Sequence, residues 1–224
     1  MVIITAVVVV RCSAGKSTGA GMQGVIVYDV TFPFEANSVM LDLYPKQMTM
    51  HFKDHMMRSS IHSSYDLLTT DFIIDNSKHS VVQMLKNMGD RVVMELQDEQ
   101  VNDWMKQYPL VRLEPTNETV TIAGYVCNKT MAYFQHDSLP PIELYHTKGL
   151  GIEPSNWWNQ FNGVDGFLMG YDIQQYGKRM RLRAREVRFA EVSSDEFVCP
   201  ANFKPVDQNE MNRQLVAVVE EFMQ

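Results

Sequence analysis

Short stretches in which polar and apolar residues alternate recur through most of this 224-residue chain. The clearest runs from Gln47 to Phe52, where Met48, Met50 and Phe52 share one face. Successive side chains of a β-strand point to opposite sides, so this period predicts strands with one buried face. Turn-forming residues separate the stretches, which favours hairpins. We therefore expect an α+β protein dominated by one antiparallel sheet.

The same pattern locates the individual elements. Helical spacing from Val101 to Tyr108, ended by Pro109, predicts one helix, and a capping pair at Asp207 and Glu210 predicts another. The helices are expected at 36–43, 97–108 and 207–222. The strands are expected at 25–32, 47–52, 55–61, 66–75, 79–85, 91–96, 117–129, 142–146, 167–173 and 180–189, the last with a bulge near Glu186.

The stretch from Asn117 to Lys129 is expected to be central to the sheet. Its polar and apolar residues alternate on both sides of Gly124. An interior glycine in a strand usually marks a bulge or a bend. We predict one bent strand, with Gly124 as the point where a curved sheet kinks.

The amino terminus has the features of an export signal. Val2 to Val10 is almost wholly apolar, and small residues follow from Ser13. The run is shorter than the roughly 20 residues that span a bilayer, and it fits the apolar part of a secretory signal. A buried strand is the alternative interpretation. We predict a signal-like segment and flexible tether over 1–23, and a single domain over 24–224.

Cys12, followed by small and flexible residues, resembles the start of a bacterial lipoprotein and is the candidate lipid anchor. Arg11 departs from that pattern, because such signals place a small residue before the cysteine. The predicted location is the periplasm or a periplasm-facing membrane. In an exported chain Cys127 and Cys199 could pair as a disulfide, although three cysteines are too few for a disulfide framework.

Composition restricts the partners and the chemistry. A net charge of −7 argues against nucleic acid as the main partner. The 16 methionines indicate either a pliable cavity or ordinary core filling. No nucleophile motif or placeable carboxylate pair is present, so we predict neither an enzyme nor a cofactor. His51, His55 and His62 lie among methionines, but a proposed turn separates the first two, and no metal is predicted.

Alternating arginines at Arg181, Arg183 and Arg185 line one face of a predicted strand. Guanidinium groups in that arrangement suit an anionic head group or an acidic partner. The alternative is a solvated face that discourages edge pairing with other sheets.

Residues 119–129, Thr-Val-Thr-Ile-Ala-Gly-Tyr-Val-Cys-Asn-Lys, resemble the Thr-Ile-x-Gly-Tyr-x-Cys-x-Lys signature of an uncharacterised family of bacterial envelope proteins with a LolA-like fold. The similarity covers about 24–204. Cys199 and the terminal helix depart from the family pattern. Further segments that match in the same order are 52–58, 144–152, 166–171, 184–187 and 197–204.

The resemblance implies a strongly curved, unclosed half-barrel whose concave face is covered by helices. In lipoprotein carriers that concave face encloses an apolar cavity for acyl chains. We accordingly expect a non-catalytic, monomeric envelope protein that binds a lipid or another apolar ligand near the membrane surface. The alternative is a structural or protein-interaction module with a filled core. The residues expected to line the cavity are Met48, Met50, Phe52, Phe167, Met169 and Tyr171.

Overall fold

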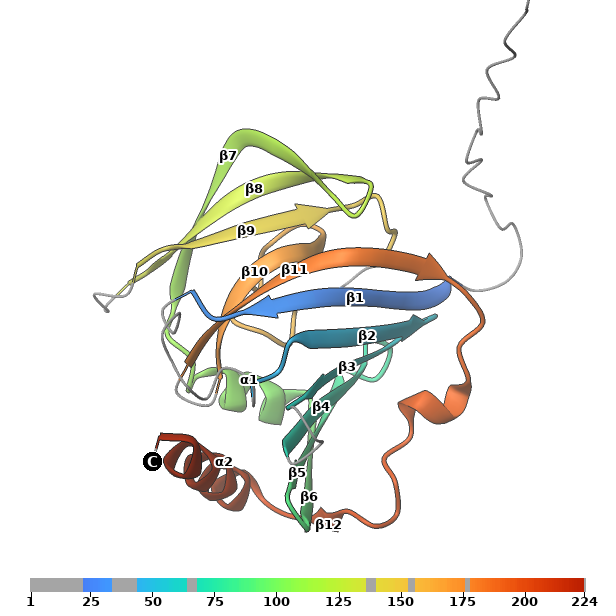
Figure 1. Cartoon of the computed structure of the whole chain (residues 1–224), viewed down its shortest axis with the longest axis vertical. Coiled ribbons are helices and arrows are strands. Elements are labelled where there is room, and N and C mark those ends of the chain that lie inside the picture. Colours follow the sequence, from blue (N-terminus) through green and yellow to red (C-terminus); the bar gives the residue numbers. More distant parts are fainter. Residues whose placement is uncertain are drawn as a thin grey trace, which may run out of the picture.

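One open sheet of 12 strands organises the computed structural model, which describes residues 22–33, 44–63, 68–135, 140–152, 156–175 and 178–223. Its order is β12-β6-β5-β4-β3-β2-β1-β11-β10-β9-β8-β7, and the sheet curves strongly (Figure 1). Neighbouring strands are antiparallel except for β12 and β6, which are parallel. The strands are β1 Gln23–Thr31, β2 Gln47–Lys53, β3 Met56–His62, β4 Leu68–Asp75, β5 Ser80–Asn87, β6 Asp90–Gln97, β7 Val111–Ile122, β8 Tyr125–Phe134, β9 Ile142–Thr147, β10 Phe167–Gln175, β11 Lys178–Phe189 and β12 Lys204–Pro205.

Two meanders build this order, and they join through the pairing of β1 with β11. The predicted strand pattern is confirmed in β2, where Met48, Met50 and Phe52 are at most 5% exposed while the residues between them are more exposed. The predicted bulge is confirmed as well. Val27 pairs with Glu186 and Tyr28 with Ala184, which leaves Arg185 as the extra residue.

Two α-helices within the described residues pack on the concave side of β4, β5 and β6. They are α1, Glu99–Met105, and α2, Gln208–Met223. Trp104 of α1 and Met211 of α2 are almost fully buried, in one apolar cluster with Leu85 of β5. The predicted helices at 97–108 and 207–222 are thus confirmed with small shifts in their ends. No helix in the described ranges is long and apolar enough to cross a membrane.

The prediction of a single bent strand over 117–129 is wrong. β7 ends at Ile122, the chain reverses, and β8 begins at Tyr125. Ala123 has φ 49° and Gly124 has φ 86°, and positive φ at both central residues is the requirement of a type I′ hairpin turn. Gly124 therefore supports a reversal instead of a bend. β7 is the last strand of the sheet, so this stretch lies at an edge and not at the centre.

The segment between β11 and α2, residues 190–206, crosses the convex face, and we call it the strap (Figure 1). Lys53 of β2 donates to the carbonyl oxygen of Val192 at 2.8 Å. The strap contains a 3-10 helix, Ser194–Phe197, and then pairs with β6 through β12. It covers an apolar patch formed by Ile73, Met84 and Val93 with its own residues Phe197, Cys199 and Phe203.

Residues 1–21 of the predicted signal-like segment and tether, with the candidate anchor Cys12, and the predicted helix at 36–43 lie outside the described residues.

Candidate functional site

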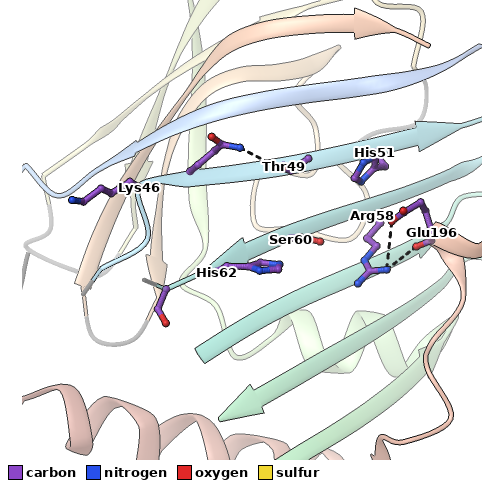
Figure 2. Close-up of a pocket in the computed structure, with 9 residues that line it drawn as sticks. Lys46, Thr49, His51, Arg58, Ser60, His62 and Glu196 are labelled. Atoms are coloured by element: carbon purple, nitrogen blue, oxygen red, sulfur yellow. Dashed lines mark hydrogen bonds and ion pairs between the residues drawn. The ribbon is translucent and has the colours of Figure 1, made fainter. Parts of the chain in front are cut away.

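A groove of about 540 Å³ lies on the convex face, between the strap and the surface of β2 and β3. Its floor exists because of strand alternation: the period that buries Met48 and Met50 turns the side chains between them outward. Figure 2 shows side chains of both strands lining the groove with Glu196 at one end. The lining residues are Lys46, Gln47, Thr49, His51, Arg58, Ser60, His62, Ser63 and Glu196.

Strand register sets which lining residues are neighbours. His51 of β2 lies opposite Arg58 of β3, and Thr49 lies opposite Ser60. Directly opposite residues of antiparallel strands have Cβ atoms about 5 Å apart. The two polar side chains of each pair are therefore close enough to bind the same ligand group. Gln47 donates from Nε2 to Thr49 Oγ1 at 3.3 Å, which orients that hydroxyl along the floor.

Arg58 connects the floor of the groove to its wall. Its Nη1 donates to the carbonyl oxygen of Glu196 at 3.0 Å, while the Glu196 carboxylate stands farther off, with Oε2 at 3.9 Å. Its Nη2 lies 3.4 Å from Oδ1 of Asp71 on β4. Both carboxylate contacts are longer than the roughly 2.8 Å of a charge-assisted hydrogen bond. The guanidinium is therefore held in place but only partly neutralised.

Three polar atoms around Arg58 are buried and have no hydrogen-bond partner among the described residues. They are Nδ1 of His51, Nε of Arg58 and Oδ1 of Asp71, whose 3.4 Å contact is an ion pair outside hydrogen-bond geometry. More than about 90% of buried polar groups in proteins are paired with protein or ordered water, so each exception asks for a physical explanation. His51 and Arg58 line the groove, so a bound molecule or ordered water in the groove is the explanation for their two nitrogens.

The groove is not predicted by the sequence. The alternation over 47–52 puts His51 on the face opposite Met48 and Met50, but only the strand register shows that Arg58 lies beside it. The three histidines considered for metal do not form one site, because His55 lies in the β2–β3 turn, away from the groove. Within the described ranges no three His, Cys, Asp or Glu side chains gather as metal ligands.

The six residues predicted to line an apolar cavity do come together. All belong to one apolar cluster on the concave side of the sheet. Five of them are at most 5% exposed, and Tyr171 is half-buried and packs edge-on against Tyr28 at 6.1 Å between ring centroids. Their side chains therefore already contact one another. A ligand cavity there remains a prediction.

The arginines of the predicted anionic-partner face all have partners within the chain. Arg181 binds the buried Asp172 carboxylate at 2.9 Å, and Arg185 pairs with Asp29 at 2.8 Å. Arg183 lies over the ring of Tyr145, 5.5 Å from its centroid. These contacts favour the interpretation of a solvated, ion-paired face.

Cys127 and Cys199, which could pair in an exported chain, are not joined by a disulfide, and both thiols are free. Cys127 is buried in the concave cluster, whereas Cys199 packs in the separate patch under the strap. The sheet separates the two clusters, so the thiols cannot meet without backbone rearrangement. Burial raises the pKa of both thiols, which keeps them protonated and weakly nucleophilic.

Comparisons with known proteins bear on the fold alone. No protein-family model matches the chain, and no curated protein sequence matches it. Among solved structures, a structure of PNGF-II is similar with a TM-score of 0.54 and 14% sequence identity. The match covers 88% of this chain but 33% of that one, so the chain spans about a third of the length of that relative. The curved open sheet is therefore an arrangement that this chain shares with part of a longer protein.

Proposed function

We propose that this protein is a non-catalytic binding module that takes a small polar ligand in the convex groove. The unpartnered buried nitrogens of His51 and Arg58, two residues that line the groove, carry the proposal. A polar atom buried without a partner costs roughly 1–3 kcal/mol, and a ligand that supplies the missing hydrogen bonds recovers that cost on binding. Every residue that lines the groove has a polar or charged side chain, which favours a polar ligand.

The non-catalytic part of the proposal rests on the position of the nucleophile candidates. The hydroxyl of Thr130 lies 2.9 Å from Nε2 of His146, an arrangement that resembles an activated nucleophile. Both side chains are at most 7% exposed, so a substrate cannot reach them. The other ring nitrogen of His146 lies 3.0 Å from the carbonyl oxygen of Asp165. This pair holds β8, β9 and a loop together.

A second candidate function is the binding of an apolar or lipid ligand on the concave side, as in the LolA-like carriers that the sequence resembles. The observation in its favour is a set of half-buried aromatic side chains, Phe72, Trp157 and Trp158, that bridge the two concave apolar clusters. Rearrangement of these rings would open apolar surface. Export, attachment through Cys12 and a location in the cell envelope belong to this proposal and not to the groove.

Thermal unfolding with and without ligands distinguishes the two sites. Small polar compounds should raise the unfolding temperature of the wild-type protein and lose that effect in Ser60→Trp, which fills the groove. Val126→Trp is the matched control, because Val126 is 66% exposed on β8, away from the groove. Stabilisation that survives in Ser60→Trp would place the ligand elsewhere.

The lipid candidate has its own readout. Protein purified from its native host and extracted with organic solvent should release a stoichiometric lipid if the concave side is occupied. An empty extract, together with no displacement of a fluorescent fatty acid, would remove that candidate.

A further inference from the structure

The charges and donors of the groove specify the ligand further, if the groove is the binding site proposed above. We propose that it binds an oxyanion, the sulfate, phosphate or carboxylate group of a small molecule, between His51 and Arg58. Two permanently cationic side chains line the groove, Lys46 and Arg58, against one acidic side chain, Glu196. Asp71 lies beneath Arg58 and is 4% exposed.

The first argument is the donor geometry. Nε of Arg58 is an N–H group that always carries a proton, so without an acceptor it is an unsatisfied donor. Nδ1 of the paired residue His51 is a second donor in the tautomer that carries its proton on this nitrogen. An oxyanion supplies several acceptor oxygens on one small centre and can meet both nitrogens at once. The hydroxyls of Thr49 and Ser60, the next residue pair on the same face of the sheet, add further donors.

The second argument concerns the competing carboxylates. The backbone carbonyl of Glu196 accepts a hydrogen bond from Arg58, but the Glu196 carboxylate oxygen is 3.9 Å from Nη1 of Arg58. The Glu196 side chain is also 44% exposed. That carboxylate can rotate into solvent when an anion enters. Asp71 stays in place and fixes the guanidinium from below. An anion bound above Arg58 would therefore complete a carboxylate–guanidinium–anion sandwich.

The third argument is the residue types of the lining. Eight of the nine lining side chains, all except that of Glu196, can donate a hydrogen bond. A compact acceptor such as an oxyanion suits such a surface.

Sulfate is the probe that tests the inference, because it is a compact oxyanion whose oxygens only accept hydrogen bonds at neutral pH. Calorimetric titration of the wild-type protein with sulfate should show one saturable site. Added sodium chloride should weaken the binding. Acetate as a second probe separates a carboxylate ligand from a tetrahedral one, and glycerol is the neutral comparison.

Two substitutions test the named donors. His51→Gln removes the imidazole, and Arg58→Lys keeps the charge but removes Nε. Each should weaken sulfate binding by about tenfold or more, the usual effect of losing a hydrogen bond to a charged group. His55→Gln and Arg112→Lys, both outside the groove, are the matched controls and should leave binding unchanged. Thermal unfolding verifies that each variant is folded.

The outcomes separate this inference from the proposed function. Binding of glycerol or another neutral polyol that is lost in Ser60→Trp, without saturable sulfate or acetate binding, would overturn the oxyanion and leave the groove as a binding site. Equal sulfate affinity in His51→Gln and wild type would overturn the assigned donors. Absence of binding for every probe, with Ser60→Trp indistinguishable from wild type, would overturn both.

Discussion

His51 and Arg58 lie directly opposite each other on β2 and β3, and each has a buried nitrogen with no hydrogen-bond partner in the described part of the chain. The strap contributes to this arrangement because the backbone carbonyl of Glu196 holds Arg58 in position. The groove therefore depends on two segments far apart in sequence, the β2–β3 hairpin and the strap.

The turn between β7 and β8 yields a prediction about backbone strain. Gly124→Ala should lower the free energy of unfolding by about 1–2 kcal/mol, the cost of a left-handed conformation for a residue with a Cβ. No steric term adds to this, since a Cβ at Gly124 meets no atom within 4 Å. Gly89→Ala is the control, because that position is equally open and has no left-handed φ. Denaturant unfolding of the two variants measures the difference, and an equal effect in both would contradict the account of the turn.

The ion pairs of β11 should differ greatly in their contributions to stability. Asp172 is 3% exposed by side chain and binds both Arg179 and Arg181, so Asp172→Asn leaves two guanidinium groups with weakened partners. We expect a loss of about 3 kcal/mol in the free energy of unfolding.

Asp29→Asn breaks the pair with Arg185, in which both side chains are at least 50% exposed, and should cost below about 1 kcal/mol. Chemical denaturation of both variants supplies the comparison. A loss from Asp29→Asn as large as that from Asp172→Asn would contradict the assignment of burial as the cause.

His146 predicts a pH dependence of stability. Burial lowers the pKa of its imidazole below the usual value, and the neutral ring is held between Thr130 and Asp165. The unfolded chain therefore binds a proton at a higher pH than the folded one. The free energy of unfolding contributed by this residue should be constant above about pH 7 and fall as the pH drops below about 6.5.

His146→Gln removes the titrating group and keeps an amide that can donate to the Asp165 carbonyl. Unfolding midpoints of wild type and variant measured between about pH 7 and about pH 5 should converge as the pH falls, because the wild type loses stability that the variant does not. Parallel curves would show that His146 does not titrate differently in the two states.

The repeating strands could be predicted from sequence because strand alternation is a local property. The spacing of Met48 and Met50 within one stretch of six residues is enough to predict a buried face. The β7–β8 hairpin could not be separated from a bent strand, because Gly124 is compatible with both and Ala123 gives no sign of positive φ. Strand order depends on contacts between segments far apart in sequence, so the position of β7 at the edge of the sheet could not be predicted from the local pattern.

The groove escaped prediction for a related reason. His51 and Arg58 meet only through the β2–β3 register, and the third contributor, Glu196, arrives from a strap with little periodic pattern. Polar residues on a strand normally indicate solvent exposure. The only local signal was the density of histidine and hydroxyl side chains between 49 and 62.

Amide NMR during a sulfate titration tests most directly that the ligand site is the convex groove. Saturable shifts should centre on Thr49, His51, Arg58 and Ser60, with smaller shifts at Glu196 in the strap, and none of these shifts should occur in His51→Gln. Shifts centred instead on the concave residues Met50 and Met169, or shifts that rise linearly without saturation, would contradict a ligand site in the groove.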